Sequence, residues 1–233
     1  MIIRPIASGS SGNAYYISDG KSSLLLDAGI PLARIQAGCG YCVSKLSGCL
    51  VTHAHSDHVK AAKDLAKLGV DIYTSQGTID MANLIGHRIH KIKALEQFET
   101  DSFTILPFDV EHDVPEPLGF LIYSKETKEK LLYVTDTYYI RYKFKGLTHI
   151  LIEANYDQDA LLSNTGTNYI DSGRAKRVIT SHMSIDTTIQ TLESFDLRLV
   201  KQIYLLHLSN DNSNAELFKE RVQAITGKEV YIC

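Results

Sequence analysis

The residues best suited to chemistry stand together in one short stretch, Thr52-His53-Ala54-His55-Ser56-Asp57-His58. Neutral imidazole nitrogens and carboxylate oxygens are the ligands that zinc and similar divalent metals take in proteins. His53 and His55 are two residues apart, so on an extended backbone their side chains project to the same side. Asp57 and His58 follow a turn of the backbone and would point into a neighbouring pocket. The spacing therefore predicts two adjacent metal positions; the alternative is a polar, pH-sensitive loop without a metal.

Ligand-type residues also follow apolar runs elsewhere in the chain. The histidine-rich stretch comes after Cys49-Leu50-Val51, Asp136 comes after Tyr133-Val134-Thr135, and His207 comes after Tyr204-Leu205-Leu206. Sites in α/β proteins collect at the carboxyl ends of strands, because the sheet holds the side chains rigidly while the loops stay free to vary. The pattern therefore favours a site built from strand ends.

Strands and helices alternate through both halves of the chain. Apolar runs bounded by turn residues predict strands at residues 2–6, 14–17, 22–26, 71–74, 102–108, 118–123, 130–135, 149–154, 177–180, 204–207 and 229–232. Helical spacing predicts helices at residues 59–68, 75–84 and 215–225. Because no G-x-G-x-x-G is present, this order favours an α/β fold with two sheets packed face to face over a Rossmann sheet.

The bulk composition is that of an ordinary globular protein. The chain has 233 residues, 44% hydrophobic and 22% charged, and a net charge of −3, so no global basic field indicates a nucleic-acid partner. No stretch reaches the length that spans a bilayer, and the first residues lack a signal-peptide pattern, so we expect a cytoplasmic protein without membrane contact. The four cysteines are too few for a disulfide framework. Cys39 and Cys42 form a lone C-x-x-C, which we interpret as thiols rather than half of a zinc knuckle or a redox pair.

The arrangement His-x-His-x-Asp-His after a strand, followed by a separate His, Asp and His, resembles the metallo-β-lactamase superfamily. The resemblance implies a four-layer αβ/βα sandwich, with two mixed sheets and outer helices, in a single domain over residues 1–233. It also implies two divalent metal ions, Zn²⁺ or Mn²⁺ with iron as a further option, because histidines suit zinc and aspartates also admit the other two. The implied ligands are His53, His55 and His112 for the first metal, Asp57, His58 and His207 for the second, and Asp136 bridging both.

Further motifs resemble a narrower group, the WalJ-like (YycJ) branch of small metallo-hydrolases. They are Ala7-Ser8-Gly9-Ser10-Ser11-Gly12-Asn13, Glu153-Ala154-Asn155-Tyr156-Asp157, Ser181-His182-Met183-Ser184 and His207-Leu208-Ser209-Asn210-Asp211-Asn212. Met183 stands where the branch has leucine, which is a conservative change for packing. The resemblance implies a phosphodiesterase, and more narrowly a DNA exonuclease with 5′→3′ polarity as one option. Its substrate would be DNA that is single-stranded or has a free end; the oligomeric state does not follow from the sequence.

The resemblance also implies roles for individual residues. A metal-bridging hydroxide would attack phosphorus, with Asp57 as a ligand that also orients it. His182 would act on the leaving side, donating a proton or binding a phosphate oxygen; the alternative is a core histidine after the strand at residues 177–180. The expected substrate-binding residues are Ser10, Ser11, Asn13, Ser184, Ser209 and Arg141.

One segment close to Asp136 suits a nucleic acid directly. Arg141-Tyr142-Lys143-Phe144-Lys145 alternates basic and aromatic side chains, which fits a single strand, with cations on phosphates and rings under bases. The alternative is a strand with period-two alternation and one buried face.

Two other functions are compatible with the same ligands. Thioester or lactone hydrolases share them, but the short segment after His207 leaves no room for the helical domain that those thioesterases usually carry. β-Lactamases generally lack a counterpart of His58 and are exported. A catalytically silent metal-binding scaffold is the non-enzymatic option; the intact Asp57 argues against it, because loss of chemistry usually removes ligands first.

Overall fold

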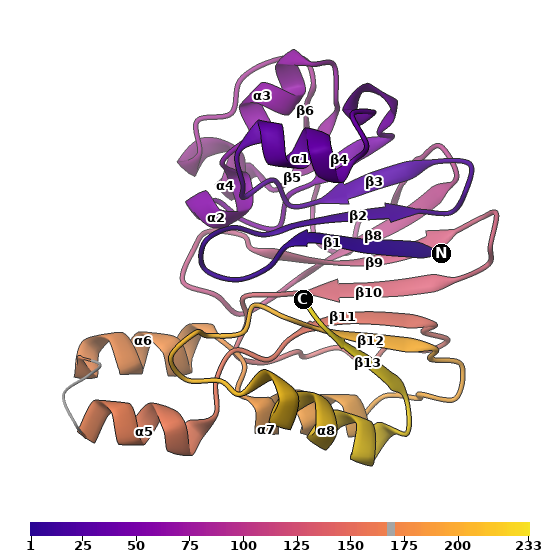
Figure 1. Cartoon of the computed structure of the whole chain (residues 1–233). Helices are drawn as coiled ribbons and strands as arrows, with labels where there is room; N and C mark the ends of the chain where they lie inside the picture. The colour runs from indigo at the N-terminus through magenta and orange to yellow at the C-terminus, as the bar shows by residue number, and fades with distance from the viewer. Residues whose placement is uncertain (167–170) are drawn as a thin grey trace. The chain divides into compact units, whose positions relative to one another are not determined.

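The computed structural model describes residues 1–166 and 171–233, which divide into two compact units. The strands form two mixed sheets with helices beside them, as the sequence predicted (Figure 1). The first unit comprises Met1–Asp109 and Val114–Glu129, and the second comprises Val110–Asp113 and Lys130–Cys233. That the chain forms a single domain stays a prediction.

The first unit contains a six-stranded mixed sheet whose strands lie in chain order. The strands are β1 (Ile2–Ala7), β2 (Ala14–Ser18), β3 (Ser23–Leu26), β4 (Gly48–Leu50), β5 (Ile72–Thr74) and β6 (Ile89–Lys91). The first three pair antiparallel, and the pairs from β3 to β6 are parallel. The same unit holds an antiparallel group, β7 (Phe98–Thr100), β8 (Phe103–Asp109) and β9 (Leu118–Ser124).

Short helices connect the strands of the first unit. They are α1 (Leu32–Gly38), the 3₁₀ helix η1 (Val43–Lys45), α2 (Ser56–Val59), α3 (Ala62–Lys67) and α4 (Gln76–Met81). The helix predicted at residues 59–68 corresponds to α3, which begins only at Ala62 because Val59 ends α2. The helix α4 begins after Ser75, as predicted, but ends at Met81 rather than at residue 84. Leu25 in β3, Cys49 in β4 and Leu65 in α3 are fully buried in one apolar core. Burying a side chain of this size stabilises the fold by about 2 kcal/mol, so this core fixes the end of β4.

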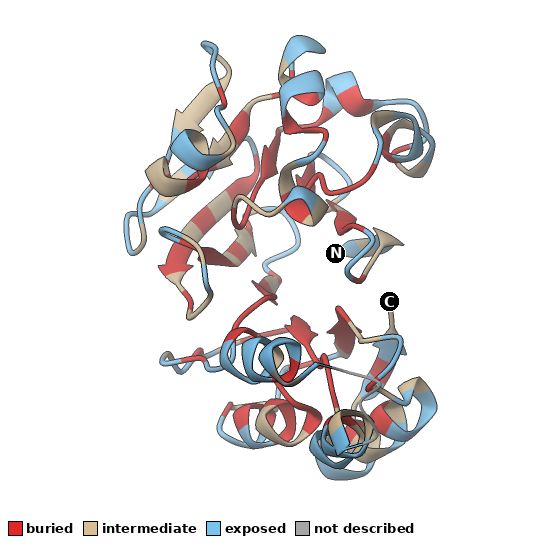
Figure 2. Cartoon of the chain, turned by 90° about the vertical axis from the view of Figure 1, so that its left-hand side faces the viewer, coloured by how far each residue is buried: buried red, intermediate tan, exposed pale blue. Residues whose placement is uncertain are grey.

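The second unit is built on four parallel strands in the order β10 (Lys130–Val134), β11 (His149–Glu153), β12 (Gln202–Leu206) and β13 (Glu229–Ile232). All five residues of β11 are buried, as expected of a parallel strand covered on both faces. The helices of this unit are α5 (Gln158–Gly166), α6 (Ser172–Ser181), α7 (Ile185–Glu193) and α8 (Ala215–Thr226). In Figure 2 the strands are largely red, whereas the outward faces of the helices are pale blue.

The strand predicted at residues 177–180 is wrong, because these residues belong to α6. The helix begins at a cap that the β-branched residues of this stretch did not reveal: the Asp171 carboxylate accepts hydrogen bonds from two backbone nitrogens of the first turn. Ala175 and Val178, three residues apart, then pack against Leu161 of α5. Tertiary packing and the cap therefore decide the conformation over strand propensity.

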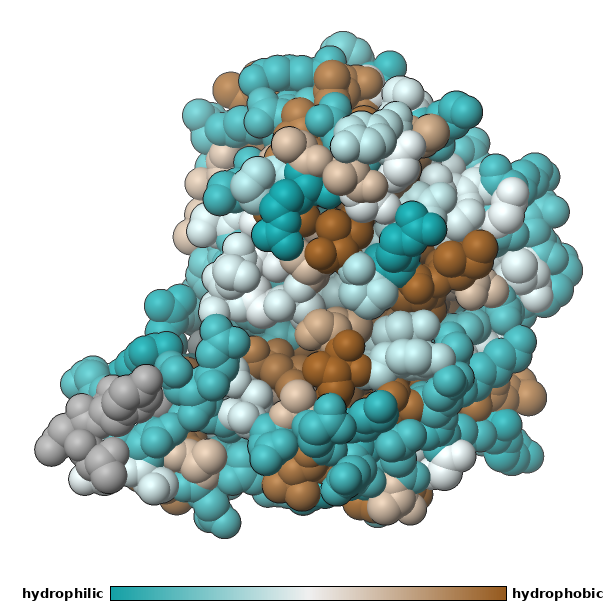
Figure 3. All heavy atoms as spheres, viewed as in Figure 1, coloured by the Kyte–Doolittle hydropathy of each residue, from teal (hydrophilic) through white to brown (hydrophobic). Residues whose placement is uncertain are grey.

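On the face that Figure 3 shows, the apolar side chains lie in small groups among hydrophilic residues. Over residues 1–166 and 171–233, no helix combines the length and the apolar content needed to cross a membrane. Cys39 and Cys49 are buried thiols, and Cys42 is exposed.

His149 gives the fold a dependence on pH that does not involve the candidate metal ligands. Its side chain is buried in β11, and its Nδ1 lies 2.9 Å from Thr148 Oγ1. Burial, with a smaller contribution from Lys201, lowers the pKa of His149 to about 4. Because the unfolded chain binds this proton near pH 6.5, the stability that His149 contributes is present above that pH and is lost as the pH falls toward 4.

Between pH 7 and pH 4.5, we therefore expect the unfolding free energy of the wild type to fall by about 2 kcal/mol more than that of His149→Gln. This value is below the full effect of the pKa shift, because the site keeps some access to solvent. Urea unfolding at a series of pH values measures the difference. Parallel pH profiles for the two proteins would contradict the assignment.

Candidate metal centre

The loop that follows β4 brings two imidazoles together in the first unit. His53 is buried, and its Nε2 lies 3.1 Å from Nδ1 of His55. Two nitrogen ligands of one tetrahedral zinc, each about 2.0–2.1 Å from the ion, would lie ~3.3 Å apart. The two side chains therefore hold their ring nitrogens at the separation that a single metal requires.

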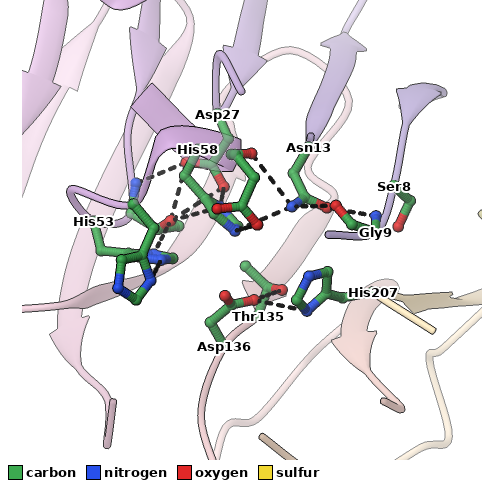
Figure 4. A network of polar contacts seen from close by, with 12 residues as sticks. Ser8, Gly9, Asn13, Asp27, His53, His58, Thr135, Asp136 and His207 are labelled. Atoms are coloured by element: carbon green, nitrogen blue, oxygen red, sulfur yellow. Dashed lines mark hydrogen bonds and ion pairs between the residues drawn. The ribbon is translucent and has the colours of Figure 1, made fainter. Parts of the chain in front are cut away.

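His58 in α2 is oriented by a buried carboxylate. Its Nδ1 lies 2.8 Å from Asp27 Oδ2, and its Nε2 lies 3.0 Å from Asn13 Nδ2 (Figure 4). Asn13 Oδ1 accepts from the backbone nitrogen of Gly9, so the amide nitrogen is the group that faces His58. Nε2 of His58 is then the acceptor and Nδ1 donates to Asp27. A histidine that binds a metal through Nε2 needs this tautomer, and a carboxylate on Nδ1 commonly fixes it.

Two other loops of the first unit hold the main chain around Asp57. Asn13 N donates to Asp57 O over 2.7 Å, and Ala28 N donates to His58 O over 2.8 Å. A Cβ added at Gly29 would lie 1.6 Å from Asp57 O, so only glycine fits there. The Asp57 carboxylate itself lies 3.6 Å from His58 Nε2. The turns at residues 9–13 and 27–29 thus fix the peptide that carries this carboxylate.

A second group of ligand-type residues lies in the second unit, at the ends of its parallel strands. Asp136 follows β10, and Thr135 Oγ1 donates to its Oδ1 over 2.8 Å. Asp136 Oδ1 lies 3.1 Å from His207 Nδ1, and Oδ2 lies 3.7 Å from His112 Nε2. The two oxygens of one carboxylate therefore face two different imidazoles. Asp136, Glu153, His182 and His207 offer ligand atoms that all lie within 4.8 Å of one another.

Glu153, at the end of β11, is the acceptor that organises this cluster. It is fully buried, and its Oε1 accepts from His182 Nδ1 over 2.7 Å and from His207 Nδ1 over 3.0 Å. Its Oε2 accepts from the backbone nitrogens of Thr137 and Met183, over 3.0 and 3.3 Å. Burial raises the pKa of Glu153, but the positive charge of His182 and the hydrogen bonds from His182 and His207 outweigh it, so that the pKa lies below its usual value.

Burial lowers the pKa values of the imidazoles in this cluster, whereas the neighbouring carboxylates raise them. Burial lowers the pKa of His207, but Asp136 and Glu153 raise it to about 10. Burial also lowers the pKa of His182, and Glu153 raises it above its usual value. At His112 burial prevails and lowers the pKa, and Nδ1 donates to a backbone carbonyl over 3.1 Å. Because ligating imidazoles are neutral, a metal entering this cluster would release protons.

Three of the polar side chains at these strand ends stand on left-handed backbone. The φ angles are 57° at Asp27, 50° at Asp136 and 53° at His207. Residues other than glycine adopt this conformation rarely, at a cost of about 1 kcal/mol or more, and it concentrates at functional sites. The left-handed turn lets each side chain leave the end of its strand at a sharp angle.

The predicted substrate-binding residues of the first unit differ in exposure. Ser10 and Ser11 are exposed in the loop after β1. Asn13 is fully buried and is engaged with Gly9 and His58. The two serines thus remain candidates for direct contact, whereas Asn13 positions the metal-ligand loop.

The predicted substrate-binding residues of the second unit are engaged with their own chain. Ser184 caps α7 by accepting from the backbone nitrogen of Thr187 over 3.1 Å. Ser209 accepts from two backbone nitrogens of the turn that follows it. Arg141 forms an ion pair with Glu111.

Asp27 and Glu153 are the residues that the sequence analysis did not assign to the site. Each directly ends or follows a buried strand, β3 for Asp27 and β11 for Glu153. The same signal that selected Asp136 and His207 was therefore present at both positions. Applied to every apolar strand, it would have found the two carboxylates that orient the histidines.

Comparisons with known proteins agree with this architecture. A family model described as a beta-lactamase superfamily domain matches residues 24–208, a span that includes every residue from His53 to His207. Exodeoxyribonuclease YycJ of Bacillus anthracis is 29% identical over 240 residues, covering 94% of this chain and 87% of its own. Exodeoxyribonuclease WalJ of Streptococcus pneumoniae serotype 2 is 33% identical over 230 residues, covering 91% of this chain and 83% of its own.

Among solved structures, the metallo-beta-lactamase fold protein YhfI from Bacillus subtilis superposes with a TM-score of 0.74 at 18% identity. That match covers 99% of this chain and 95% of the other. A diphosphatase from the PhnP family gives a TM-score of 0.68 at 17% identity, covering 99% of this chain and 94% of its own. The chain therefore belongs to the metallo-β-lactamase superfamily and has its fold.

Proposed function

We propose that this protein is a metal-dependent phosphodiesterase that acts as a DNA exonuclease. The observation that carries the proposal is the convergence of His53 Nε2 and His55 Nδ1, 3.1 Å apart, in a chain of this superfamily. Two relatives with the name exodeoxyribonuclease match more than nine tenths of the chain, which supports DNA as the substrate. Polarity from 5′ to 3′ is the direction we would test first.

We further propose that both groups of ligand-type residues hold one pair of divalent metals. The arrangement within each unit supports this, because the Nδ1 atoms of His58 and His112 donate to oxygens and leave Nε2 as the ligating atom. Zinc and manganese both accept such imidazole and carboxylate sets, and iron is the third option. The proposed ligands are His53, His55, Asp57, His58, His112, Asp136 and His207.

When bound, such a metal pair supplies a hydroxide nucleophile at neutral pH and positive charge for the phosphate oxygens. Asp57 would accept a hydrogen bond from the nucleophile and aim it in line with the leaving oxygen. Glu153 fixes the ring of His182 by accepting from Nδ1 over 2.7 Å. Nε2 of His182 is then the atom that would give a proton to the leaving oxygen or bind a phosphate oxygen.

Replacing His182 with alanine should lower kcat on DNA by about 100-fold, because a positioned general acid contributes on this scale. The loss should be only a few-fold on bis-p-nitrophenyl phosphate, whose leaving group departs without a proton. Metal content should stay unchanged, and His87→Ala, at an exposed histidine, should match the wild type in both assays. Wild-type rates for His182→Ala on every ester would contradict the role.

The proposed function is tested by reconstituting the protein with Zn²⁺ or Mn²⁺ after removal of metal by a chelator. The substrates are bis-p-nitrophenyl phosphate, 5′-phosphorylated single- and double-stranded DNA, and a thioester. We expect cleavage of the phosphodiester and release of mononucleotides from DNA, with no activity in the chelated protein. Cleavage of the thioester alone would overturn the proposal.

A further inference from the structure

A pocket of about 280 Å³ lies in the second unit, between the segment that follows β10 and helix α7. Tyr139 is 53% exposed, and Gln190 is also exposed. The side chains that matter for its chemistry are Tyr139, Arg141 and Tyr142 from the segment and Thr187, Gln190 and Thr191 from α7. Of the candidate site residues named above, only Arg141 lines this pocket.

One wall of the pocket is the segment at residues 139–143, which is anchored by buried side chains although it is not a strand. Residues 141–145 have no regular secondary structure, so the strand alternative for this stretch is wrong, yet the alternation of buried and exposed side chains is present. Ile140 and Phe144 are buried, and the ring of Phe144 meets that of Phe195 edge to face at 5.9 Å. Because Ile140 and Phe144 anchor the backbone, the side chains between them are presented to solvent from a rigid support.

Thr137 connects this pocket with the cluster around Asp136. Its backbone nitrogen donates to Glu153 Oε2 over 3.0 Å, and its hydroxyl donates to the backbone oxygen of Tyr139 over 2.8 Å. The Arg141 side chain pairs with Glu111, the residue before His112. The pocket therefore begins three residues from the candidate bridging carboxylate, and contacts within the second unit hold the two together.

The lining of the pocket matches the chemistry of a nucleotide. The rings of Tyr139 and Tyr142 offer faces on which any base can stack, and such stacking does not depend on sequence. The exposed amide of Gln190 carries a donor and an acceptor for the edge of a base. Lys143, which is exposed, places positive charge at the same rim, where the phosphates of the strand would pass.

We propose that this pocket holds one unpaired base of a single-stranded DNA substrate, next to the nucleotide that is cleaved. This inference rests on the proposed function, because a phosphodiester substrate at the Asp136 cluster brings the neighbouring base to the segment at residues 139–143. The pocket makes the enzyme favour unpaired ends, since a base inside a duplex cannot enter it.

The first test uses two adjacent tyrosines. Tyr139→Ala should raise KM for a single-stranded oligonucleotide about tenfold, the loss expected for one stacked base, with kcat and the rate on bis-p-nitrophenyl phosphate unchanged. Tyr139→Phe should restore the wild-type KM. Tyr138→Ala is the matched control, because Tyr138 is 44% exposed but does not line the pocket. An unchanged KM in Tyr139→Ala would overturn the inference.

An oligonucleotide with a single abasic residue locates the bound base. As the abasic residue is stepped along the strand from the cleaved end, one position should raise KM about tenfold in the wild type. At that position it should cause no further loss in Tyr139→Ala, because the missing base and the missing ring remove the same contact. Independent, multiplying effects at every position would overturn the inference.

Direct binding separates this inference from the proposed function. Fluorescence anisotropy with a labelled single-stranded DNA under conditions without turnover does not depend on cleavage. A wild type that cleaves no phosphodiester would refute the proposed function, yet tenfold weaker binding by Tyr139→Ala and not by Tyr138→Ala would still support the pocket. Equal binding by all three proteins would refute the pocket even if DNA is cleaved.

Discussion

Replacing Asp57 with asparagine is expected to lower kcat for phosphodiester hydrolysis by about 1,000-fold or more. The substitution keeps the size of the side chain but removes its negative charge and turns one oxygen into a donor group. A carboxylate that holds the nucleophile as a general base contributes about 10²- to 10⁴-fold, and loss of a metal ligand adds to this. Single-turnover rates on 5′-phosphorylated DNA and on bis-p-nitrophenyl phosphate measure the effect.

Asp64→Asn is the matched control for this variant. Asp64 is an exposed carboxylate in α3 of the same unit, and its Oδ1 lies 3.0 Å from Lys67 Nζ. An exposed pair of this kind contributes little to stability, and the residue is not a proposed ligand, so Asp64→Asn should retain wild-type kcat. Metal content is measured by elemental analysis in both proteins. Wild-type kcat in Asp57→Asn with full metal content would refute the role of Asp57.

The second large effect is expected at Glu153. Glu153→Gln should lose about 3 kcal/mol of unfolding free energy, because one oxygen becomes an amide group that faces donors in a fully buried site. We also expect kcat to fall about 10- to 100-fold, as for other groups that orient metal-binding histidines. The two effects have one cause, since the same carboxylate accepts from His182 and His207.

Urea unfolding and steady-state kinetics check this prediction side by side. Glu99→Gln is the control, because Glu99 is an exposed carboxylate whose Oε2 lies 3.0 Å from Lys125 Nζ. The control should leave both the unfolding free energy and kcat close to the wild-type values, because an exposed ion pair contributes little to stability. If Glu153→Gln unfolds at the same urea concentration as the control, the carboxylate does not organise the cluster.

The histidine-rich loop shows what local spacing can predict. His53 and His55 are two residues apart directly after a buried strand, and this alone suggests that both rings point the same way. In the structure their nitrogens do converge, 3.1 Å apart. The strand-end rule likewise placed Asp136 and His207 directly after β10 and β12. Each of these inferences depends only on neighbouring residues and on the alternation of strand side chains.

The partners of the histidines depend on contacts between distant parts of the chain. Asp27 and His58 are 31 residues apart, and their contact requires the parallel register in which Leu26 of β3 lies opposite Leu50 of β4. Glu153 and His207 are brought together in the same way by the pairing of β11 with β12. A single sequence contains no direct record of such registers. Similarly, the strand propensity of residues 177–180 did not reveal the cap and the packing that make α6 a helix.

The left-handed backbone at Asp27, Asp136 and His207 has a consequence for protein engineering. Glycine adopts these angles without strain. At each of the three positions, the residue that strains the backbone least is therefore one that lacks the functional side chain. A search for heat-resistant variants that scores melting temperature alone would therefore favour glycine wherever the relief of backbone strain exceeds the hydrogen bonds that the side chain makes. Variants chosen in this way would lack a side chain of the candidate site and would be inactive. Activity must therefore be selected together with thermal stability from the first round.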